Sequence, residues 1–242
     1  PKAYEETGMP REMLFDLVMP GDVLGYVTEE AAKATGFPQG LPVVATSNDK
    51  AVEGLGTGCM GDKTACVSLG TYTAAMMEGR EYLRDTKAVW PKFSCMPNKY
   101  LYDSNGIRRG MWTVSWFRDV LGDGFAKEAK AQGMSPEELL SKEAENVPVG
   151  SDGLMTVLDW LAPVDARYKK GMMIGFDGRS DRAHIYRSIL EAVAMTMKRH
   201  VDDMTNEMGV TLDQVIITGG GSNSDLLMQI FADVFGIRTV RN

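Results

Sequence analysis

The stretch QVIITGGGSNSDLLMQIFADVFG, residues 214–236, decides the fold class of this chain. It begins with the β-branched run 215–217, which leads directly into three consecutive glycines. After the glycines, apolar residues recur at helical spacing on one face: Leu227, Ile230, Phe231 and Val234. A strand, a tight turn and a helix in this order predict an α/β domain, in which helices cover a sheet.

The glycine turn in TGGGSNSDLL, residues 218–227, has two interpretations. Three glycines allow the backbone to approach a ligand closely and leave the amides of the following helix free for an anion. The same residues also fit a plain strand-to-helix turn with Ser222 or Ser224 as N-cap. Because glycine-rich turns are common, local sequence does not separate the two.

A second turn is predicted around Gly70, between the runs KTACVSLGT and YTAAMM, which indicate a β-hairpin. Amides and hydroxyls at such a tip, SLGTYT, can wrap a phosphate. A hairpin tip without a ligand is the alternative, and in isolation it is favoured. Further strand-like runs at 92–96 and 99–102 extend the predicted sheet.

The second half of the chain is predicted to be mainly helical. A helix begins near Met111, and Ser135 is the predicted N-cap of the next one. The residues expected to share one face of the first helix are Trp112, Ser115, Trp116, Val120 and Leu121. The longest helix is predicted over about 181–208, where apolar residues recur at steps of three or four, and Gly209 ends it.

A polar cluster of Asn48, Asp49 and Lys50 separates the β-branched run PVVATS, residues 42–47, from a helical segment. We expect the Asp49 carboxylate to project at the carboxyl edge of a sheet, where α/β proteins bind ligands. The alternative is that Asn48 or Asp49 caps the following helix, and local sequence favours it. Lys50 is interpreted as a solvated charge.

Composition excludes several classes of function. The chain has 242 residues, 44% of them hydrophobic, and 33 acidic against 26 basic residues give a net charge of −7. An acidic chain without a basic run does not predict a nucleic-acid partner. The 3 cysteines show no metal-ligand or disulfide pattern, and no apolar run is long enough to span a bilayer. We therefore expect a cytoplasmic protein with no membrane partner and no protein-bound metal site.

Taken together, the order and spacing of these segments resemble the FGGY carbohydrate kinases. The resemblance runs from PGDVLGYVTEEAAKATGFPQGLPVVATSNDKAVEGLGTG through KTACVSLGT and SWFRD to GMMIGFDGRSDRAHIYRSILEAVA and ITGGGSNSDLLMQIFADVFG. Residues 171–191 look like the second signature of the family. They depart from it at Phe176, where the pattern has a smaller aliphatic residue.

The resemblance implies an actin-like, ribonuclease H-like ATPase fold, in which two domains close over a sugar and ATP. Residues 1–40 are then a lead-in segment from the interdomain region. Residues 41–242 are the C-terminal nucleotide-binding domain, truncated at its C-terminal end. The partner of this chain would be the N-terminal kinase domain of the same protein, and the isolated fragment is expected to be inactive.

The resemblance also implies an activity, which is the ATP-dependent phosphorylation of a sugar or polyol hydroxyl with Mg²⁺ as metal cofactor. Asp49 matches the catalytic base, which takes the proton from that hydroxyl. The positions that match nucleotide contacts are Gly70 and Thr71 in one loop, and Gly220, Gly221 and Ser224 in the adenosine-side turn.

One further nucleotide contact is implied close to SWFRD, with Gly110, Met111 and Ser115 as candidates. The residues Asn48 and Lys50 depart from the Gly-Asp-Gln that is usual around the base. This departure keeps open an alternative, a non-catalytic actin-like protein that binds nucleotide for regulation or assembly. A homodimer is one oligomeric state that the family would allow.

Overall fold

The computed structural model describes residues 2–163 and 166–242. Its centre is a six-stranded sheet in the order β10-β9-β3-β4-β6-β5. The strands are β3 (Thr64–Leu69), β4 (Thr73–Gly79), β5 (Val89–Phe93), β6 (Tyr100–Ser104), β9 (Gln214–Thr218) and β10 (Arg238–Arg241). The first three strands in the spatial order are parallel, and each remaining pair is antiparallel. The predicted α/β class is confirmed.

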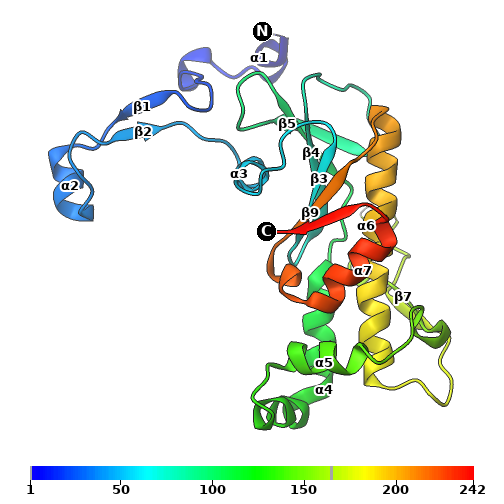
Figure 1. Ribbon diagram of the computed structural model, residues 1–242. Coiled ribbons are helices and arrows are strands. Elements are labelled where there is room, and N and C mark those ends of the chain that lie inside the picture. Colours follow the sequence, from blue (N-terminus) through cyan, green and yellow to red (C-terminus); the bar gives the residue numbers. More distant parts are fainter. Residues whose placement is uncertain (1, 164–165) are drawn as a thin grey trace.

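Helices cover both faces of this sheet (Figure 1). They are α3 (Asp49–Gly56), α4 (Gly110–Ala131), α5 (Pro136–Ala144), α6 (Arg182–Met208) and α7 (Asp225–Phe235). The long helix α6 packs against β4 and β6 and also contacts α4, α5 and α7. On the other side of the sheet, α3 contacts β4. The sheet is therefore the middle of three layers.

Strand β3 shows how the sequence fills these layers. Successive side chains of a strand point to opposite faces. Ala65, Val67 and Leu69 accordingly join the larger core beneath α6 and α7, whereas Cys66 joins a smaller cluster beneath α3. All six residues of β3 are buried. A strand covered on both faces is expected to be mainly apolar, and four of the six residues of β3 are, the exceptions being Thr64 and Ser68 near its two ends.

The predicted helix boundaries are confirmed at α6 and α7. Asp181 is the N-cap of α6, and Gly209 ends it with a left-handed φ of 66°. Ser224, not Ser222, is the N-cap of α7, because its side chain accepts a hydrogen bond from the Leu227 amide at 3.2 Å. The glycine turn forms a short 3₁₀ segment (Gly220–Asn223), which the sequence pattern did not predict.

One detail of the prediction is wrong. Strand β5 is Val89–Phe93 and does not reach residue 96, because 94–99 forms the turn to β6, closed by the Ser94 amide on the Lys99 carbonyl. In α4, Trp116 and Leu121 pack against the core beside the buried Val114 and Phe117, whereas Val120 is 61% exposed. Trp116 also meets the ring of Trp160.

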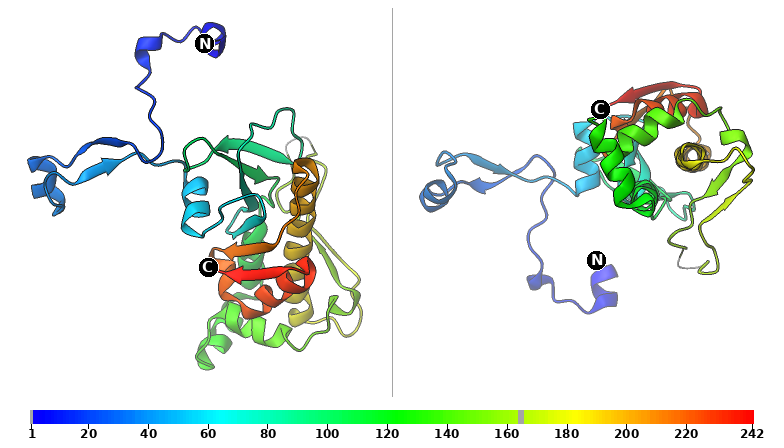
Figure 2. Two further views of the ribbon diagram at one scale, coloured as in Figure 1. Left: turned by 45° about the horizontal axis from the view of Figure 1, so that its top comes forward. Right: turned by 90° about the horizontal axis from the view of Figure 1, so that it is seen from below.

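An arm extends from the body at the N-terminal end (Figures 1 and 2). It contains α1 (Lys2–Thr7), a 3₁₀ turn (Arg11–Met13), and β1 (Val23–Tyr26) and β2 (Pro42–Val44) with α2 (Glu29–Thr35) between them. Strand β2 pairs with β1 in a separate two-stranded sheet. The expectation that residues 42–47 lead Asp49 to the edge of the central sheet is therefore corrected. Strand β2 pairs instead with β1, an antiparallel strand close to it in sequence.

A second small hairpin lies beside α6. It consists of β7 (Met155–Val157) and β8 (Met172–Ile174), and β7 contacts α6. A 3₁₀ turn (Ser151–Gly153) precedes β7 and also contacts α6. Among the described residues, no helix combines the length and apolar composition needed to cross a membrane.

A buried ion pair ties this region together. The Arg187 Nε donates to the Glu191 Oε1 at 2.8 Å, and both side chains are 8% exposed. The same carboxylate accepts hydrogen bonds from the Gly150 amide and the Ser151 hydroxyl. Arg187 also donates to the carbonyl of Ala144, at the end of α5. The pair therefore joins α6 to α5 and to the turn before β7.

We predict that Glu191→Ala destabilises the chain by about 3–5 kcal/mol, because it leaves the buried guanidinium of Arg187 without its counter-charge. The double variant Arg187→Met/Glu191→Leu should lose much less, since no charge is then left unpaired. Urea unfolding at neutral pH measures both. Equal destabilisation by the single and the double variant would contradict this account.

A second prediction concerns His184 at the start of α6. Its Nδ1 lies 2.7 Å from Asp181 Oδ1 and its Nε2 lies 3.4 Å from Asp152 Oδ2, and Asp152 is also paired with Arg179. The hydrogen bond to Asp181 raises the pKa of His184 above its usual 6.5, with Asp152 adding to the shift. The protonated imidazole thus stabilises the fold fully below about pH 6.5, and this contribution is lost as pH rises through the raised pKa.

We therefore expect the melting temperature of the wild type to exceed that of His184→Gln most at mildly acidic pH. The difference should shrink as the pH is raised through the elevated pKa of the imidazole, which loses its charge there. Thermal melts across this range check the prediction. A difference that grows with pH would show that the sign is wrong.

Candidate functional site

The two glycine turns of the sequence lie side by side at one edge of the sheet. Strands β3 and β9 are parallel neighbours, with Ser68 opposite Thr218, so the chain leaves both strands at the same edge. Gly70 and Thr71 follow β3, and Gly220 and Gly221 follow β9. All four line one cavity of about 840 Å³. Tertiary structure thus joins two loops that lie about 150 residues apart in the chain.

Close packing against Leu69 explains the glycines of the second turn. Gly219 has φ of 86°, a conformation that favours glycine, and a Cβ there would lie 2.8 Å from the Leu69 carbonyl oxygen. A Cβ on Gly221 would lie 2.8 Å from the Leu69 Cβ. At Gly220, by contrast, a Cβ would meet nothing within 4 Å. Gly220 therefore faces open space in the cavity, while its neighbours hold the turn against β3.

The start of α4 forms a third wall of the cavity. The Met111 amide donates to the Gly70 carbonyl at 3.2 Å, which fixes the helix to the hairpin tip. Met111 and Ser115 line the cavity, and Gly110 does not. Gly110 packs against Thr73 so tightly that a Cβ would lie 2.1 Å from the Thr73 hydroxyl oxygen. The geometry favours Met111 and Ser115 over Gly110 as surfaces for a ligand, and the assignment of Gly110 stays a prediction.

The remaining wall comes from α5, α6 and α7, and it carries a cluster of hydroxyls. The Ser141 Oγ lies 3.3 Å from the Tyr186 hydroxyl and 3.4 Å from the Ser224 Oγ. Burial raises the pKa of Tyr186, so its hydroxyl stays protonated at physiological pH. Sequence reasoning named Ser224 but missed Ser141 and Tyr186. Both fall within ordinary helical stretches, and only the packing of α5 against α6 brings them to the cavity.

The size and lining of the cavity suit a small-molecule ligand. Its volume falls within the range of small-molecule pockets, and its lining combines glycine backbone, hydroxyls and apolar side chains such as Val114 and Leu227. Two of its acidic side chains are already engaged: Glu137 pairs with Arg118, and Glu138 accepts from the Ser135 amide. These contacts reduce the repulsion that they would exert on an anion.

The described residues contain no group of three or more His, Cys, Asp or Glu side chains arranged to hold a metal ion. For Mg²⁺ this is compatible with binding mainly through phosphate oxygens and water, since the ion usually keeps several waters and takes one or two carboxylates. The donor set of this chain does not define an all-protein magnesium cage.

Asp49 is the first residue of α3 and is exposed. The N-cap of this helix is Asn48, whose Oδ1 accepts a hydrogen bond from the Ala51 amide at 3.0 Å. Among the described residues, Asp49 accepts a hydrogen bond only from the adjacent Lys50 amide, at 2.8 Å. The sequence left open whether Asn48 or Asp49 caps this helix, and the structure shows that Asn48 does. The carboxylate of Asp49 is exposed and does not cap the helix.

Lys50 is not a solvated charge, and that interpretation is corrected. Its side chain is only 26% exposed, and its Nζ lies 2.8 Å from Glu53 Oε2 and 3.0 Å from Ser68 Oγ. Ser68 stands two residues before Gly70 at the end of β3. The first turn of α3, which carries Asp49, is thus attached to the strand that leads into the cavity, although Asp49 does not line the cavity itself.

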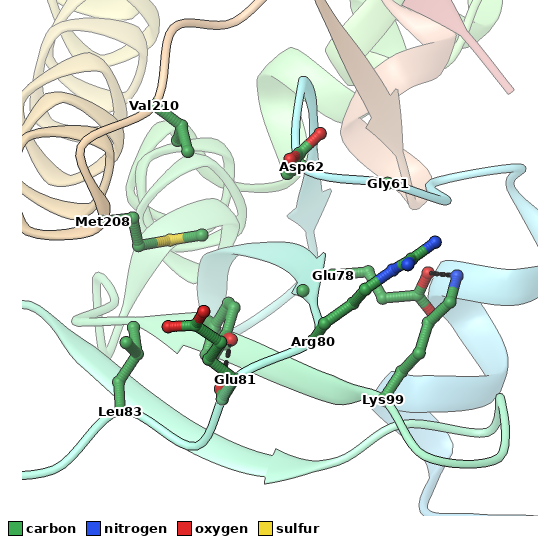
Figure 3. A pocket seen from close by; sticks show the side chains of 11 residues that line it. Gly61, Asp62, Glu78, Arg80, Glu81, Leu83, Lys99, Met208 and Val210 are labelled. Carbon is green, nitrogen blue, oxygen red and sulfur yellow. Dashed lines mark hydrogen bonds and ion pairs between the residues drawn. The ribbon is translucent and has the colours of Figure 1, made fainter.

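A second cavity, of about 500 Å³, lies at the opposite end of β3 and β4 (Figure 3). Its buried charge, Glu78, is already paired with Lys99 at 2.5 Å and accepts from the Ser94 hydroxyl. Leu83 and Met208 form an apolar side away from this pair. None of the site residues expected from the sequence lies here.

Residues 65–242 match the model of the C-terminal domain of the FGGY family of carbohydrate kinases. The chain belongs to the FGGY family. The matched range contains both glycine turns and all four walls of the cavity, whereas Asp49 and the arm precede it.

The FGGY relatives include the uncharacterized sugar kinase YgcE of Escherichia coli strain K12, which is 57% identical over 238 residues, 98% of this chain and 48% of the relative. The xylulose kinase of Bacillus subtilis strain 168 is 23% identical over 98% of this chain and 46% of its own length. The chain thus spans about half the length of the curated relatives that it matches.

Solved FGGY kinases show the same fold. A xylulose kinase from Rhodospirillum rubrum superposes with a TM-score of 0.82 at 24% identity, over 100% of this chain and 48% of that one. A gluconate kinase from Lactobacillus acidophilus gives 0.81 at 16% identity, over 99% of this chain and 47% of that one. The mixed sheet covered by helices agrees with the actin-like ATPase fold expected from the sequence.

The packing of the second glycine turn against Leu69 leads to a prediction about stability. Gly221→Ala should destabilise the chain by about 1–3 kcal/mol, because the added methyl group would overlap Leu69. Gly220→Ala is the matched control and should cost less than about 1 kcal/mol, since its Cβ meets open space. Chemical unfolding of the two variants checks this. Equal losses would mean that the turn is not held against β3 as described.

Proposed function

We propose that the complete protein is an ATP-dependent carbohydrate kinase, and that this chain is its nucleotide-binding half and carries the catalytic base. One observation carries the proposal. The two glycine turns converge on one cavity at the sheet edge where α3, with Asp49 at its first position, is attached through Lys50 to Ser68. Membership of the FGGY family supports the same activity.

In this proposal the phosphates of ATP lie against the turn at Gly70 and Thr71. Such turns bind anions through their amides. The nucleoside would extend toward Ser115 and the turn of Gly220, Gly221 and Ser224, which also line the cavity. Bound ATP would supply the phosphoryl group, and Mg²⁺ would neutralise its charge.

Asp49 is proposed as the general base. An ionised carboxylate only accepts hydrogen bonds, which suits it to take the proton of a sugar hydroxyl as that oxygen attacks phosphorus. Its exposure and the cap supplied by Asn48 leave the carboxylate available for this role. Phosphoryl transfer depends mainly on positioning and on charge stabilisation. A single well-positioned general base can therefore provide the proton transfer that the reaction needs from this chain.

The proposed partner of this chain is the N-terminal domain of the same protein. Residues 1–40 form most of the arm and are proposed to join the two domains, while 41–242 form the C-terminal domain. The arm exposes large apolar side chains, with Phe15 94% and Leu17 91% exposed. Apolar surface of this kind is normally covered by another protein surface. The chain spans 48% of its relative YgcE, and the proposed N-terminal domain, which corresponds to the rest of that relative, would cover the arm.

The proposed acceptor is a sugar or polyol, with an open-chain ketose or polyol as the narrower choice. Relatives named xylulose kinase, ribulokinase and L-fuculokinase support the broader class. The non-catalytic alternative is not favoured, because these relatives are kinases and because Lys50 is bound to Glu53 and Ser68. The departure at Lys50 therefore does not argue for the loss of the base.

Asp49→Asn in the full-length protein should lower kcat by about 100- to 10,000-fold, because the amide cannot accept the proton. Binding of ATP and the thermal stability should be nearly unchanged, since Asn48 still caps α3. ADP release over a panel of pentuloses, hexuloses, aldonates and polyols measures kcat, calorimetric titration measures ATP binding, and a thermal melt measures stability. Undiminished turnover by this variant would exclude Asp49 as the base.

A matched control removes the cap instead. Asn48→Ala should destabilise the protein by about 0.5–2 kcal/mol, because the Ala51 amide loses its acceptor, and it leaves the carboxylate of Asp49 in place. The two neighbouring positions should thus separate chemistry from stability. ATP binding without turnover across the whole panel would instead favour the regulatory alternative.

A further inference from the structure

The helix that carries Asp49 is short and weakly anchored. It spans eight residues, of which only Ala51 and Gly54 are buried. Isolated helices of this length are not stable in water, so contacts to the rest of the fold must hold α3 in place. The orientation of the Asp49 carboxylate depends on which contacts fix the first turn.

Two side-chain hydrogen bonds join that first turn to other elements in the described part of the chain, in addition to the packing of Ala51 in the smaller core cluster. Cys95 Sγ lies 3.0 Å from the Ala51 carbonyl. The Lys50 ammonium donates to Ser68 Oγ at 3.0 Å and pairs with Glu53 at 2.8 Å within the same helix. The Lys50 contact is the one that reaches β3, next to the turn at Gly70.

The burial of this cluster makes the contact stronger than a surface ion pair. The side chains of Lys50 and Glu53 are 26% and 25% exposed, and Ser68 is 6% exposed. Hydrogen bonds to charged groups are stronger than those between neutral groups. Glu53 balances the charge of Lys50, so the ammonium can sit beside β3 without an uncompensated charge.

We propose that Lys50 is a positioning residue, which locks the helix of Asp49 to the end of β3 and thereby holds the base at a fixed place relative to the turn at Gly70 and Thr71. The inference rests on the proposed kinase function and assigns Lys50 a role in it. In this proposal Lys50 acts through Ser68, and two of the three N–H groups of its ammonium are engaged within the protein.

This role has a specific kinetic consequence. A base displaced by about 1 Å can cost on the order of 100-fold in rate, although the nucleotide site is intact. Loss of the Lys50 contact should therefore appear in kcat. The KM values for ATP and for the acceptor should change little, because neither Lys50 nor Ser68 contributes to the cavity lining.

The test uses the full-length kinase and its best acceptor from the panel. Lys50→Met keeps the aliphatic stem and removes the ammonium, and Ser68→Ala removes only its acceptor. Each should lower kcat by about 10- to 100-fold, with both KM values within about threefold of the wild type. The double variant should be no slower than the slower single one, because both substitutions break the same contact.

Lys63→Met is the matched control, since its side chain is 67% exposed and lies 3.9 Å from Asp213, away from α3. It should retain the wild-type kcat. Normal kcat in Lys50→Met or Ser68→Ala would overturn the proposal. So would a raised acceptor KM in Lys50→Met that Ser68→Ala does not reproduce, since that pattern indicates direct contact with the substrate.

Failure of the kinase assignment gives a different result. In that case the wild type releases no ADP with any acceptor, or Asp49→Asn remains active. If Lys50→Met lowers the melting temperature, Ser68→Ala still tests the link, because it removes one hydroxyl and leaves the Lys50–Glu53 pair in place. Impaired kcat in both variants with additive losses would also contradict a shared role.

Discussion

The parallel pairing of β3 with β9 is the constraint on which the candidate site depends. Ser68 lies opposite Thr218, so two strands that are distant in sequence end at the same level and release their turns at one edge. A shift by one residue would reverse the faces of every side chain on β3, moving Leu69 out of the core. The close approach of Gly219 and Gly221 to Leu69 then fixes the second turn against the first. The cavity between them follows from this register and from the packing of α4, α5 and α6 around it.

The helices around this edge contribute different things. Helix α4 attaches directly to the hairpin tip through the Met111 amide, and α5 and α6 supply hydroxyls that line the cavity. The buried Arg187–Glu191 pair holds α6 to the end of α5. Such a pair is weak evidence for added stability, because desolvation offsets much of the attraction, but breaking one side of it is costly. It is well suited to specify how two cavity-lining helices meet.

The same sheet edge also relates the cavity to Asp49. The helix α3 lies on the opposite face of the sheet from α6, so the proposed base and the proposed nucleotide approach β3 from different sides (Figure 1). The Lys50–Ser68 hydrogen bond joins the helix of Asp49 to the strand that leads into the cavity. The exposed arm and the match to about half the length of the FGGY relatives fit the proposal that a second domain completes the site. In that proposal this domain supplies the glycine turns and the base, and the other domain supplies the contacts to the sugar.

The sequence by itself determined the local elements, because their signals are local. Alternating and helical periodicities gave β3, β4, β9 and α6, and caps such as Ser135 and Gly209 gave helix ends, since each satisfies backbone groups within a few residues. It also gave the family, through several motifs in order. Tertiary structure alone decided that β2 lies outside the central sheet and pairs with β1. It also decided that Ser141 and Tyr186 line the cavity and that Lys50 is bound to Ser68. These are contacts between distant segments, and they depend on strand register and helix packing, which no short stretch of sequence encodes.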